Sequence, residues 1–159
     1  NKQKGLDYKK YQLIIKKFLN KYKSKIIFEP GRSIIGNTGT LISKIIYIKK
    51  SGKKNFIILD AAMNDLMRPA LYGAIHRIMP SLKKNKISNE NHEFVGPICE
   101  STDSFLNLKK FQELRENEIV VVCDVGAYGM SLSSNYNLRP KPIELLIKGS
   151  KIKAVSYTH

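Results

Sequence analysis

The first part of the chain alternates apolar and charged positions with the period of a helix. Between residues 7 and 23, lysines fill one face, and apolar side chains recur at steps of three and four: Tyr8, Tyr11, Ile15, Phe18 and Tyr22. This spacing predicts an amphipathic helix. The next run, SKIIFE at residues 24–29, is short and apolar, as is typical of a buried strand. A helix followed by a buried strand indicates the closing unit of an α/β layer or barrel.

Beyond Gly31 the pattern is that of strands separated by turns. Residues 39–50 are rich in strand-forming residues and lead into the turn signal SGKK. A second strand, within NFIILDAAM, ends at Asp60, and the run EIVVVC predicts a third that continues into the Gly-rich turn VGAYG. Two more strands, separated by KGS, are expected in residues 139–155.

The remaining segments are polar or mixed. Residues 82–94 are polar and predict a loop, whereas residues 108–117 predict a short helical or irregular stretch on the surface. In residues 63–75, Asn64 or Asp65 is suited to cap a short helical turn, while the proline of MRPAL limits how far a helix can run before it.

Length and composition fit a globular chain. At 159 residues it has room for one domain or parts of two, and a hydrophobic fraction of 42% is enough for an ordinary core. No run of about 18 apolar residues is present, so no membrane-spanning segment is expected. The N-terminus lacks an apolar signal region, and its first residue is not Met, so we expect the chain to begin inside a longer protein. Two cysteines give no disulfide framework, which fits a reducing cytoplasm.

The net charge of +15 raises the question of nucleic-acid binding. Codon composition is the stronger explanation, because Lys, Ile and Asn are abundant here and are read from AT-rich codons. A protein that reads base pairs would use more arginine for bidentate contacts. Few of the basic residues are arginine: Arg32, Arg68, Arg77, Arg115 and Arg139. Without a DNA-binding motif, nucleic acid is not an expected partner, and three scattered histidines give no metal-site spacing.

Two motifs carry groups suited to anions. In FEPGRS, Pro30 fixes one backbone dihedral and Gly31 lets the backbone approach a ligand. The amides of this turn and Arg32 could hold an anion, although a generic strand-to-loop turn explains the motif as well. Arg68 and Tyr72, four residues apart, lie on one side if their segment is helical, and such a pair can clamp a carboxylate. A surface arginine beside a half-buried tyrosine is the more common explanation.

Two further motifs carry a thiol and a tyrosine. VGPICESTDSF places Cys99 directly before Glu100, with Asp103 close behind. In VGAYG, small neighbours leave the ring of Tyr128 free to project toward a pocket. The other cysteine, Cys123, lies within an apolar run and is expected to be a small buried residue.

Taken together and in order, four blocks resemble the diaminopimelate decarboxylases: EPGRS, DAAMNDLMRPALYGA, VGPICESTD and DVGAYGMSLSSNYNLRPKPIELLI. These enzymes are the lysine-forming branch of the fold-type III pyridoxal 5'-phosphate (PLP) decarboxylases. The resemblance implies conversion of meso-2,6-diaminopimelate to L-lysine and CO₂ in the cytoplasm. It also implies an α/β plus mostly β fold, in which a (β/α)₈ PLP-binding barrel precedes a β-sandwich or Greek-key β-barrel domain. Residues 1–35 would be the last helix and strand of the barrel, and residues 36–159 the C-terminal β domain.

The resemblance further implies a homodimer in which each active site is shared between two head-to-tail subunits. Cys99 of one subunit would donate a proton to the carbon that loses CO₂ in the other subunit's site. Glu100 would hold the distal amino group of the substrate. The family usually has Gly where this chain has Thr102, and because a β-branched residue resists positive φ, the loop is expected to differ slightly.

Around the cofactor, the resemblance assigns Glu29 to the pyridine nitrogen of PLP. A carboxylate there keeps the nitrogen protonated, which favours decarboxylation over racemisation. Gly31 and the backbone of Arg32 would contact the phosphate, in a turn shaped by Pro30. Tyr128 would contact both PLP and the substrate.

The substrate carboxylate that stays would be gripped by Arg32, Arg68 and Tyr72. This clamp, with Glu100 rather than Asp after the cysteine, argues for diaminopimelate. The alternatives are a related PLP decarboxylase acting on ornithine, arginine or carboxynorspermidine, or a non-catalytic decarboxylase-like binding subunit. The family's PLP-binding lysine segment and the Gly-rich phosphate loop ahead of EPGR are absent. We therefore expect the chain to be the C-terminal part of an enzyme and to be inactive alone.

Overall fold

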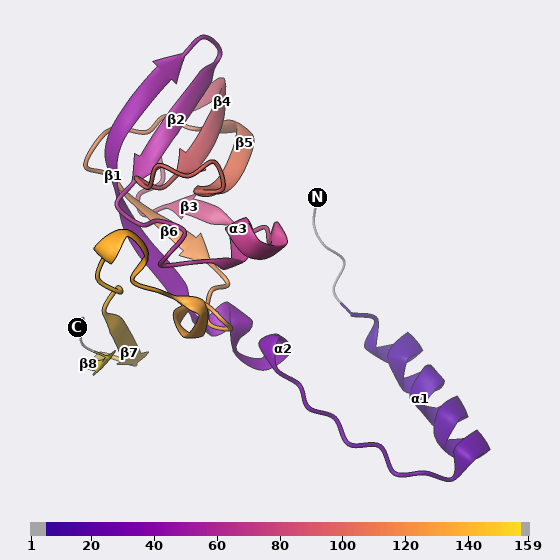
Figure 1. The fold of residues 1–159 in the computed structure, drawn as a ribbon. Helices are drawn as coiled ribbons and strands as arrows, with labels where there is room; N and C mark the ends of the chain where they lie inside the picture. Colours follow the sequence, from indigo (N-terminus) through magenta and orange to yellow (C-terminus); the bar gives the residue numbers. More distant parts are fainter. Residues whose placement is uncertain (1–5, 157–159) are drawn as a thin grey trace. The chain divides into compact units, whose positions relative to one another are not determined.

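The structure is a computed structural model that describes residues 6–156 in two compact units, which divide between Pro30 and Gly31 (Figure 1). Among these described residues, the first unit contains one helix, and the second contains the strands. Expectations that concern residues 1–5 and His159 lie outside the described residues. Within residues 6–156, no helix has the length and hydropathy needed to cross a bilayer.

The helix of the first unit, α1 (Tyr8–Tyr22), confirms the prediction from the apolar period. At its start, Oδ1 of Asp7 accepts the N–H of Lys10 at 3.1 Å, which satisfies a donor left open in the first turn. At its end, Lys23 has a φ of 45° and donates its N–H to the carbonyl oxygen of Leu19 at 2.9 Å. A left-handed residue of this kind ends a helix.

The strand expected at residues 24–29 is not formed, and that prediction is wrong for this chain. These residues belong to no helix or strand, and Ile27 is 87% exposed. A strand is stabilised by hydrogen bonds to a neighbouring strand, and no strand among the described residues pairs with this segment. The apolar run identified a segment that is suited to a sheet, but it carried no information about the partner strand.

The second unit consists of a six-stranded sheet, a two-stranded hairpin and short helices. In chain order its elements are α2 (Arg32–Ile35), η1 (Gly36–Thr38), β1 (Thr40–Ser51), β2 (Lys54–Leu59), α3 (Arg68–Tyr72), β3 (Ile78–Pro80), β4 (Ile87–Val95), β5 (Ser104–Gln112), β6 (Ile119–Cys123), η2 (Met130–Leu132), η3 (Tyr136–Leu138), β7 (Glu144–Lys148) and β8 (Lys151–Ser156).

The large sheet has the strand order β3-β6-β1-β2-β4-β5. All neighbouring pairs are antiparallel except β2 and β4, which are parallel. The long strand β1 serves both halves of the sheet, because residues 40–44 pair with β6 and residues 45–51 pair with β2. The register shifts between Ile45 and Tyr47. Such a bulge bends a strand and increases its twist, which allows β1 to change partners (Figure 1).

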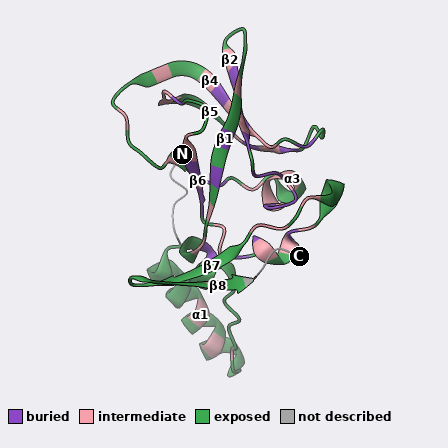
Figure 2. Cartoon of the chain, turned by 90° about the vertical axis from the view of Figure 1, so that its left-hand side faces the viewer, coloured by how far each residue is buried: buried purple, intermediate pink, exposed green. Residues whose placement is uncertain are grey.

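The sheet curls around a single hydrophobic core. The edge strands contribute Ile78 from β3 and Phe105 from β5 to the same cluster as Ile45 from the central strand. Phe94 and Ile45 are fully buried, and burying a side chain of this kind stabilises the fold by about 1.5–3 kcal/mol. Figure 2 shows the buried positions along the strands of this sheet. The prediction of a mostly β, barrel-like C-terminal domain is confirmed, and the (β/α)₈ barrel itself is not in this chain.

Two strands lie where the polar pattern predicts none. β4 covers most of the loop expected at residues 82–94, and β5 includes the first part of the irregular stretch expected at residues 108–117. Only His92 and Phe94 are buried on β4, so the alternation of apolar positions is too short to reveal a strand. Backbone pairing with neighbours stabilises both strands, and sequence periodicity does not detect pairing. Both predictions are therefore wrong.

The hairpin of β7 and β8 confirms the two strands expected around KGS, and Gly149 provides the positive φ of 60° that its turn requires. All five side chains of β7 are exposed (Figure 2). The strands expected in residues 39–50, at NFIIL and at EIVVVC are likewise confirmed as β1, β2 and β6.

Candidate active site

The short helix α3 presents Arg68 and Tyr72 to the surface. Pro69 occupies its first turn, where a missing N–H costs nothing. The helix ends at Gly73, whose φ of 60° lets its N–H reach the carbonyl oxygens of Arg68 and Pro69. The four-residue spacing places Arg68 and Tyr72 on one side, as the sequence predicts, and Tyr72 is 66% exposed.

The guanidinium of Arg68 contacts a buried histidine, His76. Nη1 of Arg68 lies 3.2 Å from Nε2 of His76, and Nδ1 of His76 lies 3.0 Å from the carbonyl oxygen of Cys123 at the end of β6. His76 is only 2% exposed, and this burial is the main cause that lowers its pKa. The positive charges of Arg68 and Arg32 lower the pKa of His76 further.

Tyr128 lies next to Gly31. It adopts a φ of 62°, which is uncommon for a residue with a side chain, and its ring is 53% exposed. A Cβ added to Gly31 would lie 3.1 Å from the Tyr128 hydroxyl oxygen, so glycine provides the room between them. The turn that carries Tyr128 is fixed to the start of the second unit, because the N–H of Gly126 donates to the carbonyl oxygen of Gly36 at 3.0 Å. A Cβ at Gly126 would collide with the carbonyl oxygen of Ile35, which explains the glycine there.

Two groups of predicted residues emerge: Gly31 and Arg32 beside Tyr128, and Arg68 with Tyr72 on α3. The charges of Arg32 and Arg68 both act on His76. We call these residues the arginine site: Gly31, Arg32, Arg68, Tyr72 and Tyr128. The site joins α2, α3 and the turn after β6, three segments that are far apart in the sequence. Glu29 and Pro30 belong to the first unit, so the structure does not place them relative to this site.

The predicted pair Cys99 and Glu100 lies on a separate loop, residues 96–103, which we call the thiol loop. Cys99 is an exposed free thiol. Oε1 of Glu100 accepts a hydrogen bond from the Tyr136 hydroxyl at 2.5 Å, and this bond raises the pKa of Tyr136. Within residues 6–156, no hydrogen bond or ion pair joins Cys99 or Glu100 to a side chain of the arginine site.

A buried carboxylate anchors the thiol loop. Asp103 is 4% exposed and accepts the N–H of Ile98 at 2.8 Å and the N–H of Met63 at 2.7 Å. Burial raises the pKa of Asp103, although these two hydrogen bonds act in the opposite direction. A Cβ at Gly96 would collide with this carboxylate, so glycine is required at that end of the loop. The expected distortion at Thr102 is not required, because Thr102 is not among the residues with positive φ.

Sequence reasoning missed a second polar anchor, centred on Arg139. Its Nε donates to Oδ1 of Asn64 at 3.1 Å, its Nη2 donates to the Asp60 carbonyl oxygen at 2.5 Å, and Nη2 lies 3.8 Å from Oδ2 of Asp65. Nδ2 of Asn64 also donates to the Ser134 carbonyl oxygen at 3.2 Å. Together these bonds connect the segment after β2 to the segment after Tyr128. The signal was the polar pair ND inside the apolar run AAMNDLM, because buried polar groups require partners.

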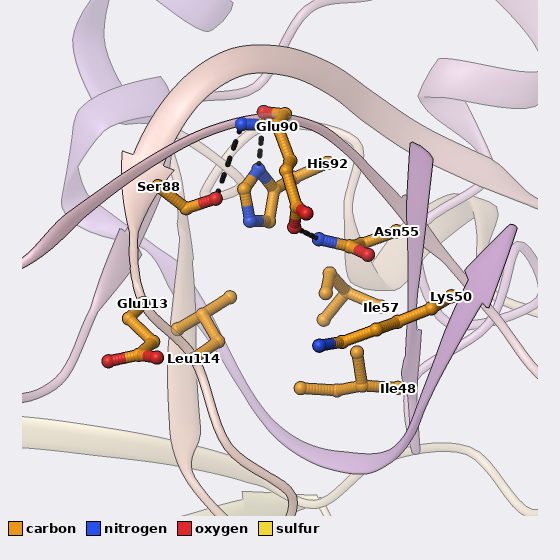
Figure 3. Close-up of a pocket in the computed structure, with 9 residues that line it drawn as sticks. All are labelled: Ile48, Lys50, Asn55, Ile57, Ser88, Glu90, His92, Glu113 and Leu114. Atoms are coloured by element: carbon orange, nitrogen blue, oxygen red, sulfur yellow. Dashed lines mark hydrogen bonds between the residues drawn. The ribbon is translucent and has the colours of Figure 1, made fainter. Parts of the chain in front are cut away.

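A small polar hollow elsewhere in the unit does not compete as an active site. It has a volume of about 100 Å³ and lies between strands β1, β2 and β4 and the end of β5 (Figure 3). The polar groups around Glu90 are already paired: Asn55 donates to its carboxylate, and its own N–H donates to Ser88 Oγ at 3.2 Å. Nδ1 of His92 lies 2.9 Å from the Glu90 carbonyl oxygen. The lining contains none of the residues predicted for the site.

The family model for the pyridoxal-dependent decarboxylase, C-terminal sheet domain, matches residues 10–126. The chain belongs to this decarboxylase family. Similar curated relatives are diaminopimelate decarboxylases, from Aquifex aeolicus (42% identical over 142 residues, 89% of this chain) and Neisseria meningitidis serogroup B (39% over 145 residues, 91% of this chain). The chain spans 34% of the length of each.

Part of a solved decarboxylase structure has the same fold as this chain. Diaminopimelate decarboxylase from Helicobacter pylori, complexed with L-lysine, is 39% identical with a TM-score of 0.86, and the match covers 99% of this chain and 39% of that one. The resemblance to the diaminopimelate decarboxylases read from the four sequence blocks is therefore confirmed.

Proposed function

We propose that this decarboxylase chain supplies the C-terminal part of an enzyme that converts meso-2,6-diaminopimelate to L-lysine and CO₂. Two contacts carry the proposal: Gly31, next to Arg32 in the chain, lies beside the Tyr128 hydroxyl, and the Arg68 guanidinium contacts buried His76. The names of the curated relatives support the reaction, and the lysine bound to the Helicobacter pylori enzyme supports the product. We further propose that the enzyme is a cytoplasmic homodimer.

The residues of the arginine site fit the phosphate of PLP. Gly31 leaves room beside the Tyr128 hydroxyl, and Arg32 provides a guanidinium next to the backbone amides of the same turn. When bound, PLP accepts the electrons that are released as CO₂ leaves. In the proposed arrangement, Glu29 keeps a proton on the ring nitrogen, Pro30 shapes the phosphate turn, and Tyr128 contacts the cofactor and the substrate.

The substrate is a dicarboxylate with two amino groups, and the chain offers a partner for each charge that must be held. Arg68, with Arg32 and Tyr72, would bind the carboxylate that stays, since a guanidinium matches a carboxylate with two hydrogen bonds. Glu100 would bind the distal amino group, and the Cys99 thiol would donate its proton to the carbon that loses CO₂. We propose that Cys99 and Glu100 enter the site from the second subunit, because they lie on the separate thiol loop.

We also propose that residues 1–35 supply the last helix of the PLP-binding barrel and a segment that becomes its last strand only beside the neighbouring barrel strands, and that residues 36–159 form the C-terminal β domain. In the first unit, α1 has no buried residue, and Leu13, Ile14 and Ile27 are 60%, 56% and 87% exposed. Apolar side chains of this kind would be covered by the other strands and helices of a barrel.

The test is a substrate competition with the full-length protein that carries this chain. Purified protein loaded with PLP is given meso-diaminopimelate, ornithine, arginine or carboxynorspermidine, and CO₂ and the amine product are measured. We expect CO₂ and L-lysine from diaminopimelate, with weak competition from the other three. A preference for ornithine or arginine would overturn the substrate assignment, and failure to bind PLP would favour a non-catalytic binding subunit. The Arg68→Gln variant is expected to raise KM for diaminopimelate, and His92→Gln, a change at a residue outside the arginine site, is the control.

A further inference from the structure

We propose that His76 is a positioning residue that holds the guanidinium of Arg68 in place through a ring nitrogen that carries no hydrogen. The inference rests on the proposed function only for its kinetic readout, because the contact between the two side chains is independent of any substrate. His76 contacts no other residue of the arginine site through a hydrogen bond within the described chain.

The two hydrogen bonds of His76 determine its tautomer. A backbone carbonyl oxygen accepts hydrogen bonds but cannot donate one, so Nδ1, at 3.0 Å from the Cys123 oxygen, must carry the ring hydrogen. In a neutral ring Nε2 then has a free lone pair. Arg68 can only donate, and its Nη1 lies 3.2 Å from Nε2. Donor and acceptor therefore match at both ends of the ring in one protonation state.

The surroundings of His76 favour that neutral state. The ring is 2% exposed, the Arg68 guanidinium contacts it, and the charge of Arg32 on α2 also disfavours a second proton. Asp124, directly after β6, and the Cys123 carbonyl act in the opposite direction, but burial dominates and the pKa is lowered. A second proton would place an N–H on Nε2 against the guanidinium, which removes the acceptor and sets two positive charges together.

The position of His76 shows why α3 depends on it. The helix is only five residues long, from Arg68 to Tyr72, and contributes no buried side chain of its own. His76 follows it by four residues and connects it to the end of β6. The long side chain of Arg68 loses rotamer freedom when it is fixed before the substrate arrives, and a preorganised clamp binds more tightly. Loss of the Nε2 acceptor should therefore weaken substrate binding rather than the chemical step.

The kinetic test uses the full-length enzyme. His76→Asn keeps a donor toward the Cys123 carbonyl but lacks the Nε2 acceptor, whereas His76→Gln can place its amide oxygen near the Nε2 position. We expect His76→Asn to raise KM for diaminopimelate about tenfold with kcat changed less than about twofold. We expect His76→Gln to restore most of the affinity. The matched control is His92→Asn, since His92 is also buried and bonds a carbonyl through Nδ1 but has no hydrogen bond to an arginine among the described residues.

The double variant Arg68→Gln with His76→Asn separates positioning from a merely structural role. If His76 acts through Arg68, the double variant should raise KM no more than Arg68→Gln alone. Additive effects, or a His76→Asn variant with normal KM, would overturn the proposal. A full-length protein without decarboxylase activity would instead overturn the proposed function.

A second readout does not depend on activity. In full-length protein labelled with ¹⁵N-histidine, the His76 resonances, assigned by their loss in His76→Asn, should show a protonated Nδ1 and an unprotonated Nε2 at pH 7. Arg68→Gln should shift the Nε2 signal, and the corresponding His92 signals should not move. A protonated Nε2, or an Nε2 signal indifferent to Arg68→Gln, would contradict the proposal even if the variants fold poorly.

Discussion

The arginine site and the thiol loop each depend on a buried polar side chain, His76 in the first and Asp103 in the second. The two buried side chains differ in what they fix. His76 holds a side chain, because its ring contacts the guanidinium of Arg68. Asp103 holds the main chain, because its carboxylate accepts the N–H groups of Ile98 and Met63. Damage to the first anchor should therefore change the affinity for a carboxylate, whereas damage to the second should change the course of a loop.

The two anchors also respond to pH in opposite directions. The pKa of His76 is lowered, so between its folded pKa and about 6.5 the unfolded state binds more protons, and stability is lost as pH falls through this range. The pKa of Asp103 is raised, so above 3.8 the folded state binds more protons, and stability is lost as pH rises through the raised pKa. His76 thus reduces the stability of the domain as pH falls, whereas Asp103 reduces it as pH rises.

The largest effect is expected at the exposed end of the thiol loop. If Cys99 donates the proton, Cys99→Ala in the full-length enzyme should lower kcat about 100-fold or more, because general-acid catalysis contributes that much. Urea unfolding should be unchanged, since the thiol is exposed. Ser101→Ala is the control, because it alters an exposed side chain of the same loop without a hydrogen-bond partner among the described residues. Full activity of Cys99→Ala would show that the proton comes from another group.

The next effect is expected at the anchor of that loop. Asp103→Ala leaves the buried N–H of Ile98 and the partly buried N–H of Met63 without acceptors and should lower the free energy of unfolding by about 2–4 kcal/mol. Asp103→Asn keeps one acceptor oxygen and should cost roughly half as much. Urea denaturation of the full-length protein measures both. A loss below about 0.5 kcal/mol for Asp103→Ala, the level of an ordinary surface substitution, would mean that the loop does not depend on this carboxylate.

The smallest effect is the pH dependence carried by His76. As pH falls from 7 to 5, the wild-type protein should lose stability that His76→Gln does not lose, because the unfolded wild-type chain takes up a proton on His76 more readily than the folded one and the variant cannot. Urea midpoints measured at closely spaced pH values provide the comparison, with His92→Gln as the control. Parallel pH profiles for wild type and His76→Gln would contradict the lowered pKa of His76.

The sequence predicted the elements whose signal is local. α1, β1, β2, β6 and the β7–β8 hairpin have the period, the caps or the turn residues that identify them, and Arg68 and Tyr72 share one helix as their spacing required. β4 and β5 could not be predicted, because their side chains are mostly polar and their stability comes from pairing with neighbouring strands. The strand predicted at residues 24–29 is absent for the opposite reason. Its side chains are apolar, but its backbone has no strand to pair with among the described residues.

The site was predictable in its exposed groups and not in its anchors. The four sequence blocks pointed to Cys99, Glu100, Arg68 and Tyr128. Of these residues, Arg68 is half-buried and the other three are exposed. His76, Asp103 and Arg139 act through partners that lie far along the chain, such as Cys123, Met63 and Asn64. A single sequence does not show which distant residues are in contact. From the sequence alone, His76 therefore cannot be distinguished from an ordinary core or surface histidine.

The central claim is that the arginine site of one subunit and the thiol loop of another make one active site. The direct measurement is subunit complementation in the full-length enzyme, with the Arg32→Gln, Arg68→Gln double variant and the Cys99→Ala variant co-expressed under different tags. Each variant alone should be nearly inactive, and each mixed dimer should contain one site with all its groups intact. Random pairing then predicts recovery of about a quarter of wild-type kcat per subunit. Purified mixed dimers with no more activity than the single variants would contradict the claim.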